Sequence, residues 1–210
     1  MVDHSFQRNV FLNCPFDSEY RPILQAILFC VVRFGLTPRI ATERSDAGEP
    51  RVQKIMHLIE SSRYSIHDLS RCQAHEAGEH YRLNMPFELG MDFGCRHYGG
   101  EPHSRKVILI LEEQPYRYRA AISDLAGSDV EAHGGDFATA VRKVRNWITG
   151  LGGFDLVGAG RILAEYEDFH EWHYERQLEA GFADEDIQDY STPELLHAMI
   201  EWTDQLLSNK

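Results

Sequence analysis

The stretch Lys106-Val107-Ile108-Leu109-Ile110-Leu111 is the most informative part of this chain for its fold. Five aliphatic residues follow one lysine without interruption. A strand that is buried on both faces has this continuous apolar character, as the central strands of parallel sheets do. We therefore predict a strand over 106–111, in the middle of a parallel sheet, and place the other elements around it.

Three more strands and five helices can be predicted before residue 150. Short β-prone runs lie at 9–13, 37–41 and 63–69. Helical patterns lie at 19–34, 51–62, 84–98, 116–125 and 136–149. Pro22 and Pro86 suit first helical turns, Asn84 can cap its helix, and Gly35 suits a helix end. Strands and helices alternate, which predicts an α/β domain whose parallel sheet has helices on both faces.

The pattern changes after residue 150. A glycine-rich segment at 152–160 is interpreted as a hinge, because no strand precedes it and no Lys-Ser or Lys-Thr pair follows it. Two amphipathic helices follow, at 161–181 and from residue 192 onward. We predict two parts: an α/β domain over 1–150 and a C-terminal helical hairpin over 151–210.

Composition excludes several functional classes. The chain has 210 residues and a formal net charge of −12, which disfavours binding to DNA or RNA. Its four cysteines have no CxxC spacing, so we expect reduced thiols and no metal site. No signal-like or membrane-length apolar segment is present in the sequence, which predicts a cytoplasmic protein without a membrane partner.

Ligands of open parallel sheets bind beyond the carboxyl ends of the strands. Collecting polar and aromatic side chains at those ends gives one candidate site. Its predicted members are Asn13, Phe16 and Asp17 after the first strand, Arg44, Asp46, Gly48 and Arg51 after the second, Asp68 and Ser70 after the third, and Asn84 and Glu88 on the next helix. Convergence from separate segments is stronger support than any single residue.

Glu88 is the strongest catalytic candidate. Cleavage of an N-glycosidic bond passes through an oxocarbenium-like state, which a nearby carboxylate can stabilise or attack. The alternative reading is a charge that stabilises the helix N-terminus. Asp68 would orient ribose or water, or it caps a turn. Arg44 and Arg51 could bind phosphate.

The segments Val10-Phe11-Leu12-Asn13, Arg44-Ser45-Asp46-Ala47-Gly48, 63–70 and Phe87-Glu88-Leu89-Gly90 resemble those of bacterial TIR-like domains. They are also similar to those of nucleoside 2-deoxyribosyltransferases. Both groups have flavodoxin-like sheets, so the resemblance implies a flavodoxin-like fold and a nucleotide-binding domain over 1–150. The resemblance covers roughly residues 8–150. It implies that Glu88 acts on the glycosidic bond, that the loop from Arg44 to Pro50 borders the nucleotide, and that the chain forms a homo-oligomer.

The resemblance therefore implies an NAD glycohydrolase that uses NAD as its substrate, needs no further cofactor and acts in antiphage defence. Three alternatives stay open. One is a nucleotide sensor that holds its ligand without cleaving it. Another is an enzyme like the deoxyribosyltransferases. The third is an assembly protein that docks through Trp172 and Trp202 in its acidic C-terminal part.

Overall fold

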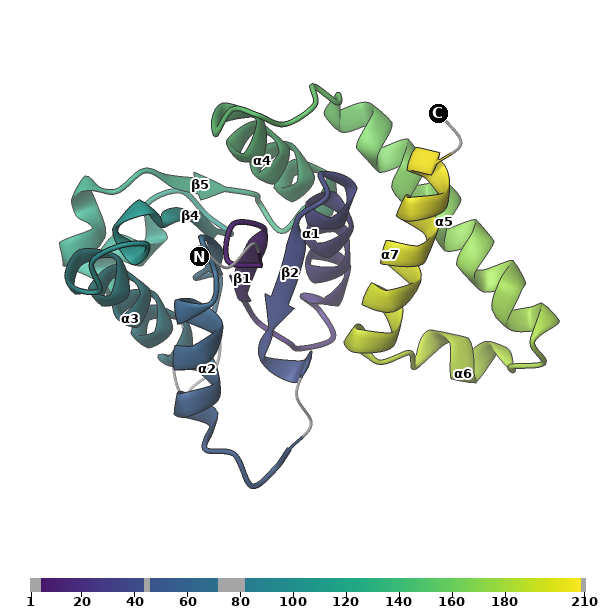
Figure 1. Ribbon diagram of the computed structural model, residues 1–210, viewed down its shortest axis with the longest axis horizontal. Coiled ribbons are helices and arrows are strands. Elements are labelled where there is room, and N and C mark those ends of the chain that lie inside the picture. Colours follow the sequence, from purple (N-terminus) through teal and green to yellow (C-terminus); the bar gives the residue numbers. More distant parts are fainter. Residues whose placement is uncertain (1–4, 44–45, 72–81, 209–210) are drawn as a thin grey trace.

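The computed structural model describes residues 5–43, 46–71 and 82–208. Its centre is a five-stranded, all-parallel sheet of order β2-β1-β3-β4-β5 (Figure 1). The strands are β1 Asn9–Asn13, β2 Thr37–Ile40, β3 Tyr64–Asp68, β4 Val107–Glu112 and β5 Val130–Ala132. This order is flavodoxin-like, so the predicted fold class is confirmed.

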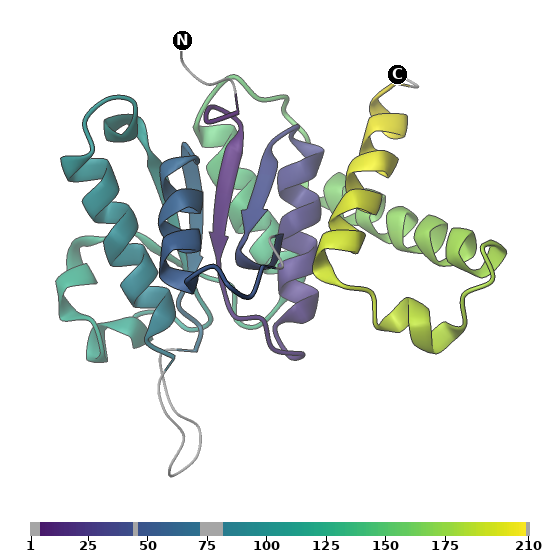
Figure 2. The ribbon, with the colours of Figure 1, turned by 60° about the horizontal axis from the view of Figure 1, so that its bottom comes forward.

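Helices cover both faces of the sheet. On one face lie α1 Arg21–Arg33 and α4 Phe137–Gly150, which contact each other extensively. On the other face lie α2 Arg51–Glu60 and α3 Asn84–Tyr98 (Figure 2). Side chains alternate along each strand, so β1 gives Val10 and Leu12 to the α1 side and Phe11 to the α2 side.

Three expectations before residue 150 were wrong. The strand β5 was not predicted, because it has only three residues and a glutamate at its centre. The segment predicted as a helix at 116–125 forms two short 3₁₀ turns, Arg117–Ala120 and Ser123–Gly127. Asn84 does not cap α3, since Leu83 holds the cap position and no side chain caps that end.

The C-terminal part consists of α5 Ala159–Glu179, a short α6 Asp184–Gln188 and α7 Thr192–Ser208. Gly152 and Gly153 adopt positive φ angles of 76° and 79° in the turn after α4, a conformation that favours glycine. Figure 1 shows α5 and α7 beyond α1, on the side away from the sheet. Residues of α5 and α7 belong to the same apolar cluster as residues of α1, β1 and β4.

Aromatic packing and one buried ion pair attach these helices to α1. The Phe29 ring lies 5.7 Å from the Phe169 ring and 5.6 Å from the Trp202 ring, measured between centroids. Arg33 Nε donates to Glu165 Oε2 at 2.5 Å, and both side chains are buried. Trp202, which the assembly hypothesis offered to a partner, thus packs within its own chain. None of the described helices is long and apolar enough to cross a bilayer.

Candidate functional site

The carboxyl ends of the strands meet at one edge of the sheet, and the strand order reverses between β1 and β3. That reversal is the usual ligand position in open parallel sheets. Asn13, the last residue of β1, lies at this point and is buried. Its amide nitrogen donates to the Met85 carbonyl oxygen at 2.8 Å and lies 2.9 Å from His67 Nδ1. Asn13 therefore fixes the start of α3 over the ends of β1 and β3.

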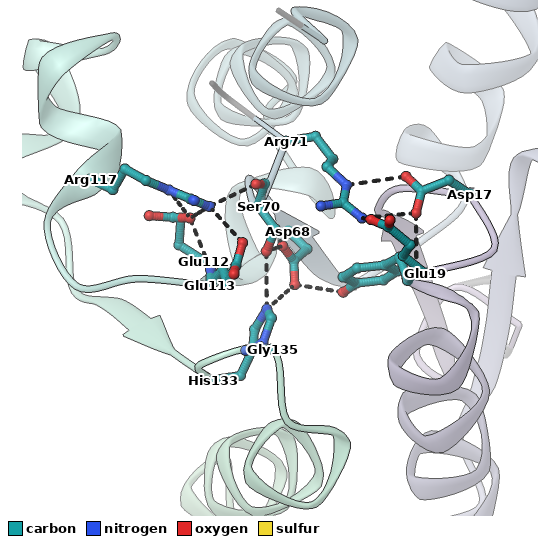
Figure 3. Close-up of polar contacts among 11 residues, drawn as sticks. Asp17, Glu19, Asp68, Ser70, Arg71, Glu112, Glu113, Arg117, His133 and Gly135 are labelled. Atoms are coloured by element: carbon teal, nitrogen blue, oxygen red, sulfur yellow. Dashed lines mark hydrogen bonds and ion pairs between the residues drawn. The ribbon is translucent and has the colours of Figure 1, made fainter. Parts of the chain in front are cut away.

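Asp68, at the end of β3, forms the centre of a buried polar cluster (Figure 3). Tyr20 donates its hydroxyl to Asp68 Oδ2 at 2.5 Å, and His133 Nε2 lies 3.0 Å from the same oxygen. Ser70 donates its backbone N–H to Asp68 Oδ1 at 2.9 Å, and its hydroxyl donates to that oxygen as well. The cluster thus joins β3 to the start of α1 and to the segment after β5.

Hydrogen bonds outweigh burial in setting the pKa of Asp68. Burial, the largest influence, raises this pKa, but the bonds from His133, Ser70 and Tyr20 together hold it below its ordinary value. Asp68 is therefore an ionised, fully engaged carboxylate at neutral pH. Tyr20 responds in the opposite direction, because burial and the Asp68 charge raise its pKa.

A nucleophilic triad combines a serine, a histidine and an aspartate. Ser70, His133 and Asp68 have these side chains but do not form such a triad. In a triad the serine and the carboxylate use opposite ring nitrogens of the histidine. Here Ser70 Oγ and Asp68 both lie beside Nε2, at 3.1 Å and 3.0 Å. The other nitrogen, Nδ1, accepts from the Gly135 backbone N–H at 3.1 Å, so Nε2 carries the ring proton. The arrangement orients a carboxylate and does not activate the serine.

Glu88 lies in the second turn of α3, on the other face of the sheet. Glu88 is 6% exposed. Among the described residues, the charged partner of its carboxylate is Arg51, whose Nη2 atom lies 3.9 Å from Glu88 Oε1. That separation exceeds a hydrogen bond, and the Arg51 side chain is 60% exposed. Burial raises the pKa of Glu88 to about 7, and Arg51 only partly opposes this rise.

Cys14 lies just after β1, close enough to Asp68 and Glu88 for both charges to affect its thiol. Its thiol is buried, and burial is the main reason why its pKa is raised well above the ordinary value. The charges of Asp68, Glu88 and Asp17 raise it further. The charges of three predicted site carboxylates therefore affect the Cys14 thiol, just after β1, which places the three groups around a common region of the edge. Cys14 is a neutral thiol and not a nucleophile.

Two arginine clusters flank Asp68 (Figure 3). Arg71 donates to both carboxylate oxygens of Asp17, at 3.2 Å and 3.0 Å, and this contact lowers the pKa of Asp17. On the other side Arg117 donates to Glu112 and to the Ser70 carbonyl oxygen, the latter at 2.7 Å. The edge is therefore lined by ionised groups that come from four segments of the chain.

The remaining predicted residues that the structure describes lie around the same edge or near it. Phe16 follows β1 and is 39% exposed, as a ring that stacks on a ligand would be. Asp46 and Gly48 form an exposed turn in which the Gly48 N–H donates to Asp46 Oδ1 at 2.8 Å. Asn84 is exposed at the start of α3. Arg44 lies outside the described residues.

Sequence reasoning missed His133, Tyr20 and Arg117. His133 directly follows β5, so the rule that collected the other residues would have found it if that strand had been predicted. Tyr20 and Arg117 lie on elements whose contacts with β3 arise only on folding. Among the described residues no three His, Cys, Asp or Glu side chains are grouped as metal ligands. No protein-family model matches this chain, and no curated protein matches it either.

Proposed function

We propose that this protein hydrolyses the N-glycosidic bond between nicotinamide and ribose in NAD, with Glu88 as the carboxylate that faces the anomeric carbon. The observation that carries the proposal is the environment of Glu88. Glu88 is buried and has a pKa of about 7, and the charged partner that it has among residues 5–43, 46–71 and 82–208 is the distant Arg51. Perturbed carboxyls in such positions are frequent in active sites.

The chemistry follows from the charge of Glu88. The bond between C1′ and the pyridinium nitrogen breaks, and its electron pair neutralises the ring, so nicotinamide leaves without being protonated. Positive charge then develops on the ribose. An ionised Glu88 is poorly solvated in its buried position and stabilises that charge strongly. Water adds to C1′ and releases one proton, which gives ADP-ribose.

The other residues of the edge have supporting roles in this proposal. The α3 N-terminus has no acidic residue in its first turn and no side-chain cap, which favours a phosphate there despite the negative net charge. Arg51 is exposed and beside Glu88, so it can meet a phosphate as well. Asp68 is buried, and Tyr20, His133 and Ser70 occupy both of its oxygens, so its role in this proposal is to hold the carboxyl edge of the sheet in a fixed shape.

The direct test is incubation of the purified protein with NAD, followed by chromatography of the products. Wild type should release nicotinamide and ADP-ribose, and Glu88→Gln should reduce turnover by about 100-fold or more. Glu60→Gln, which changes an exposed carboxylate on α2, is the matched control and should retain full turnover. Wild-type inactivity, or equal activity of Glu88→Gln and wild type, contradicts the proposal. NAD bound but recovered intact identifies a sensor instead.

The dependence of turnover on pH should follow the ionisation of Glu88. Because the carboxylate form is the active one and its pKa is about 7, kcat/KM should rise from pH 6 to pH 8 and then level off. Arg51 lowers this pKa, so Arg51→Met should move the rise to higher pH, by less than about one pH unit because Arg51 is exposed. A rise that moves to lower pH in Arg51→Met would show that another group controls it.

A further inference from the structure

A buried polar network lies beneath α2 and α3. It consists of Asn13, His67, Asp92 and Lys106, none of which is more than 3% exposed. Asn13 and His67 belong to β1 and β3, Asp92 belongs to α3, and Lys106 directly precedes β4. The helices α2 and α3 contact each other over this part of the sheet (Figure 2). The network therefore connects three neighbouring strands with the helices that cover them.

The direction of each hydrogen bond in the network is fixed. The Asn13 amide nitrogen donates one hydrogen to the Met85 carbonyl oxygen at 2.8 Å. It donates its second hydrogen to His67 Nδ1, 2.9 Å away, so Nε2 carries the ring hydrogen. His67 Nε2 lies 3.0 Å from Asp92 Oδ2 and therefore donates to it. Because one arrangement of hydrogens satisfies all three contacts, these side chains hold one another in a single geometry.

Asp92 and Lys106 add a fully buried ion pair to the network. Lys106 Nζ lies 3.2 Å from Asp92 Oδ1. The same ammonium donates to the Ile59 carbonyl oxygen at 2.7 Å and to that of Ser62, at the end of α2. Burial, the largest influence, raises the pKa of Asp92, but the His67 contact and the Lys106 charge together hold it below its ordinary value. Asp92 is therefore ionised, and Lys106 links the end of α2 to α3.

Glu88 lies between the two points at which the network holds α3. Met85 lies one turn before Glu88 and Asp92 one turn after it, and all three are buried on the same face of the helix. Asn13 holds the first point and His67 the second. The start of α3 is thus fastened to the sheet on both sides of Glu88.

We propose that Asn13, His67, Asp92 and Lys106 are positioning residues that hold α3 against the sheet and thereby fix the place of the Glu88 carboxylate. Their importance for catalysis rests on the proposed function, whereas their effect on Glu88 does not. A buried ion pair contributes little net stability compared with neutral residues of similar volume, because desolvation offsets the attraction. What its directional contacts supply here is a single position for the helix.

The surroundings of Glu88 separate an effect of position from an effect of charge. Burial raises the pKa of Glu88, and among the described residues the charge that affects it is that of Arg51 on α2. Cys14, after β1, is a neutral thiol, and Asp68 at the end of β3 is ionised. Neutralising both members of the buried ion pair keeps the net charge. A change in the pKa of Glu88 would then report that the carboxylate itself has moved.

The test measures the pKa of Glu88 without using turnover. Urea denaturation from about pH 4 to about pH 9 compares a protein with its Glu88→Gln counterpart, and their stability difference stops growing at the folded pKa of Glu88. Asp92→Asn/Lys106→Met removes both charges at similar volume and should fold. In this double variant the pKa of Glu88 should fall from about 7 by about one unit, because water reaches a less firmly held carboxyl. Asn13→Ala, which releases α3 at Met85, should shift it in the same direction.

Arg33→Met/Glu165→Gln is the matched control, because it removes a buried ion pair between α1 and α5. It should leave the pKa of Glu88 at its wild-type value. The proposal is overturned if Asp92→Asn/Lys106→Met and Asn13→Ala both keep that value, or if wild type and Glu88→Gln show no separation. Should the double variant not fold, Asn13→Ala decides alone. A shifted pKa without NAD turnover by wild type supports the positioning network and contradicts only the proposed function. With turnover, the rise of kcat/KM with pH should shift by the same amount.

Discussion

Glu88→Gln is expected to stabilise the protein by about 3 kcal/mol near pH 8.5 and to leave its stability almost unchanged near pH 4.5. The pKa of Glu88 is about 7 in the folded protein, raised by burial from an ordinary value of 4.5. Each tenfold difference in proton affinity between the folded and unfolded states corresponds to about 1.4 kcal/mol. Denaturation in urea at several pH values measures the difference between the two proteins.

The sign of this effect is specific to a carboxyl whose pKa is raised. The contribution of Glu88 to stability is fully present below the unfolded pKa and is lost as the pH rises through about 7, because the folded state then has to ionise a buried group. Glutamine does not ionise, so the two stability curves should separate between about pH 4.5 and pH 7 and run parallel above. Glu60→Gln should follow wild type at every pH. Parallel curves for Glu88→Gln and wild type throughout would mean that Glu88 is not a perturbed acid.

Asp68→Ala should destabilise the protein by about 3–5 kcal/mol at pH 7. The substitution removes the acceptor that Tyr20, Ser70 and His133 share, and it leaves their donors buried without partners. The isosteric change Asp68→Asn should cost less, since one oxygen remains as an acceptor. Asp46→Ala is the control, because Asp46 is exposed and the hydrogen bond that it makes among the described residues is within its own turn. Its expected effect is within about 0.5 kcal/mol.

The pH dependence of Asp68→Asn should be opposite to that of Glu88→Gln. The folded pKa of Asp68 is lowered, so its contribution is present above the unfolded value of about 3.9 and is lost as the pH falls through the folded pKa. The stability gap between wild type and Asp68→Asn should stay constant from pH 6 to pH 8 and shrink in acid. A gap that widens in acid would exclude an ionised, hydrogen-bonded Asp68.

The order and type of most elements followed from the sequence. Continuous apolar runs such as 107–111 occur where both faces of a strand are buried, and crossover helices must separate parallel strands. The predicted bounds of β1 and α3 agree with the structure. Because parallel strands end at the same edge, the order of the elements also predicted that Asp68, Ser70 and Glu88 belong to one candidate site.

Contacts between distant segments were decided only by the tertiary structure. The apolar residues Val52 and Met56 of α2 are 46% and 47% exposed, while Leu58 of the same helix is buried. His133 follows a strand too short and too polar to stand out, and its proximity to Asp68 depends on β5 joining the sheet beside β4. The pKa of Glu88 depends on how deeply α3 buries it and how far Arg51 stays away. Hydrophobic patterning is local and can be read from one chain, whereas burial and charge pairing are sums over neighbours that are brought together only by folding.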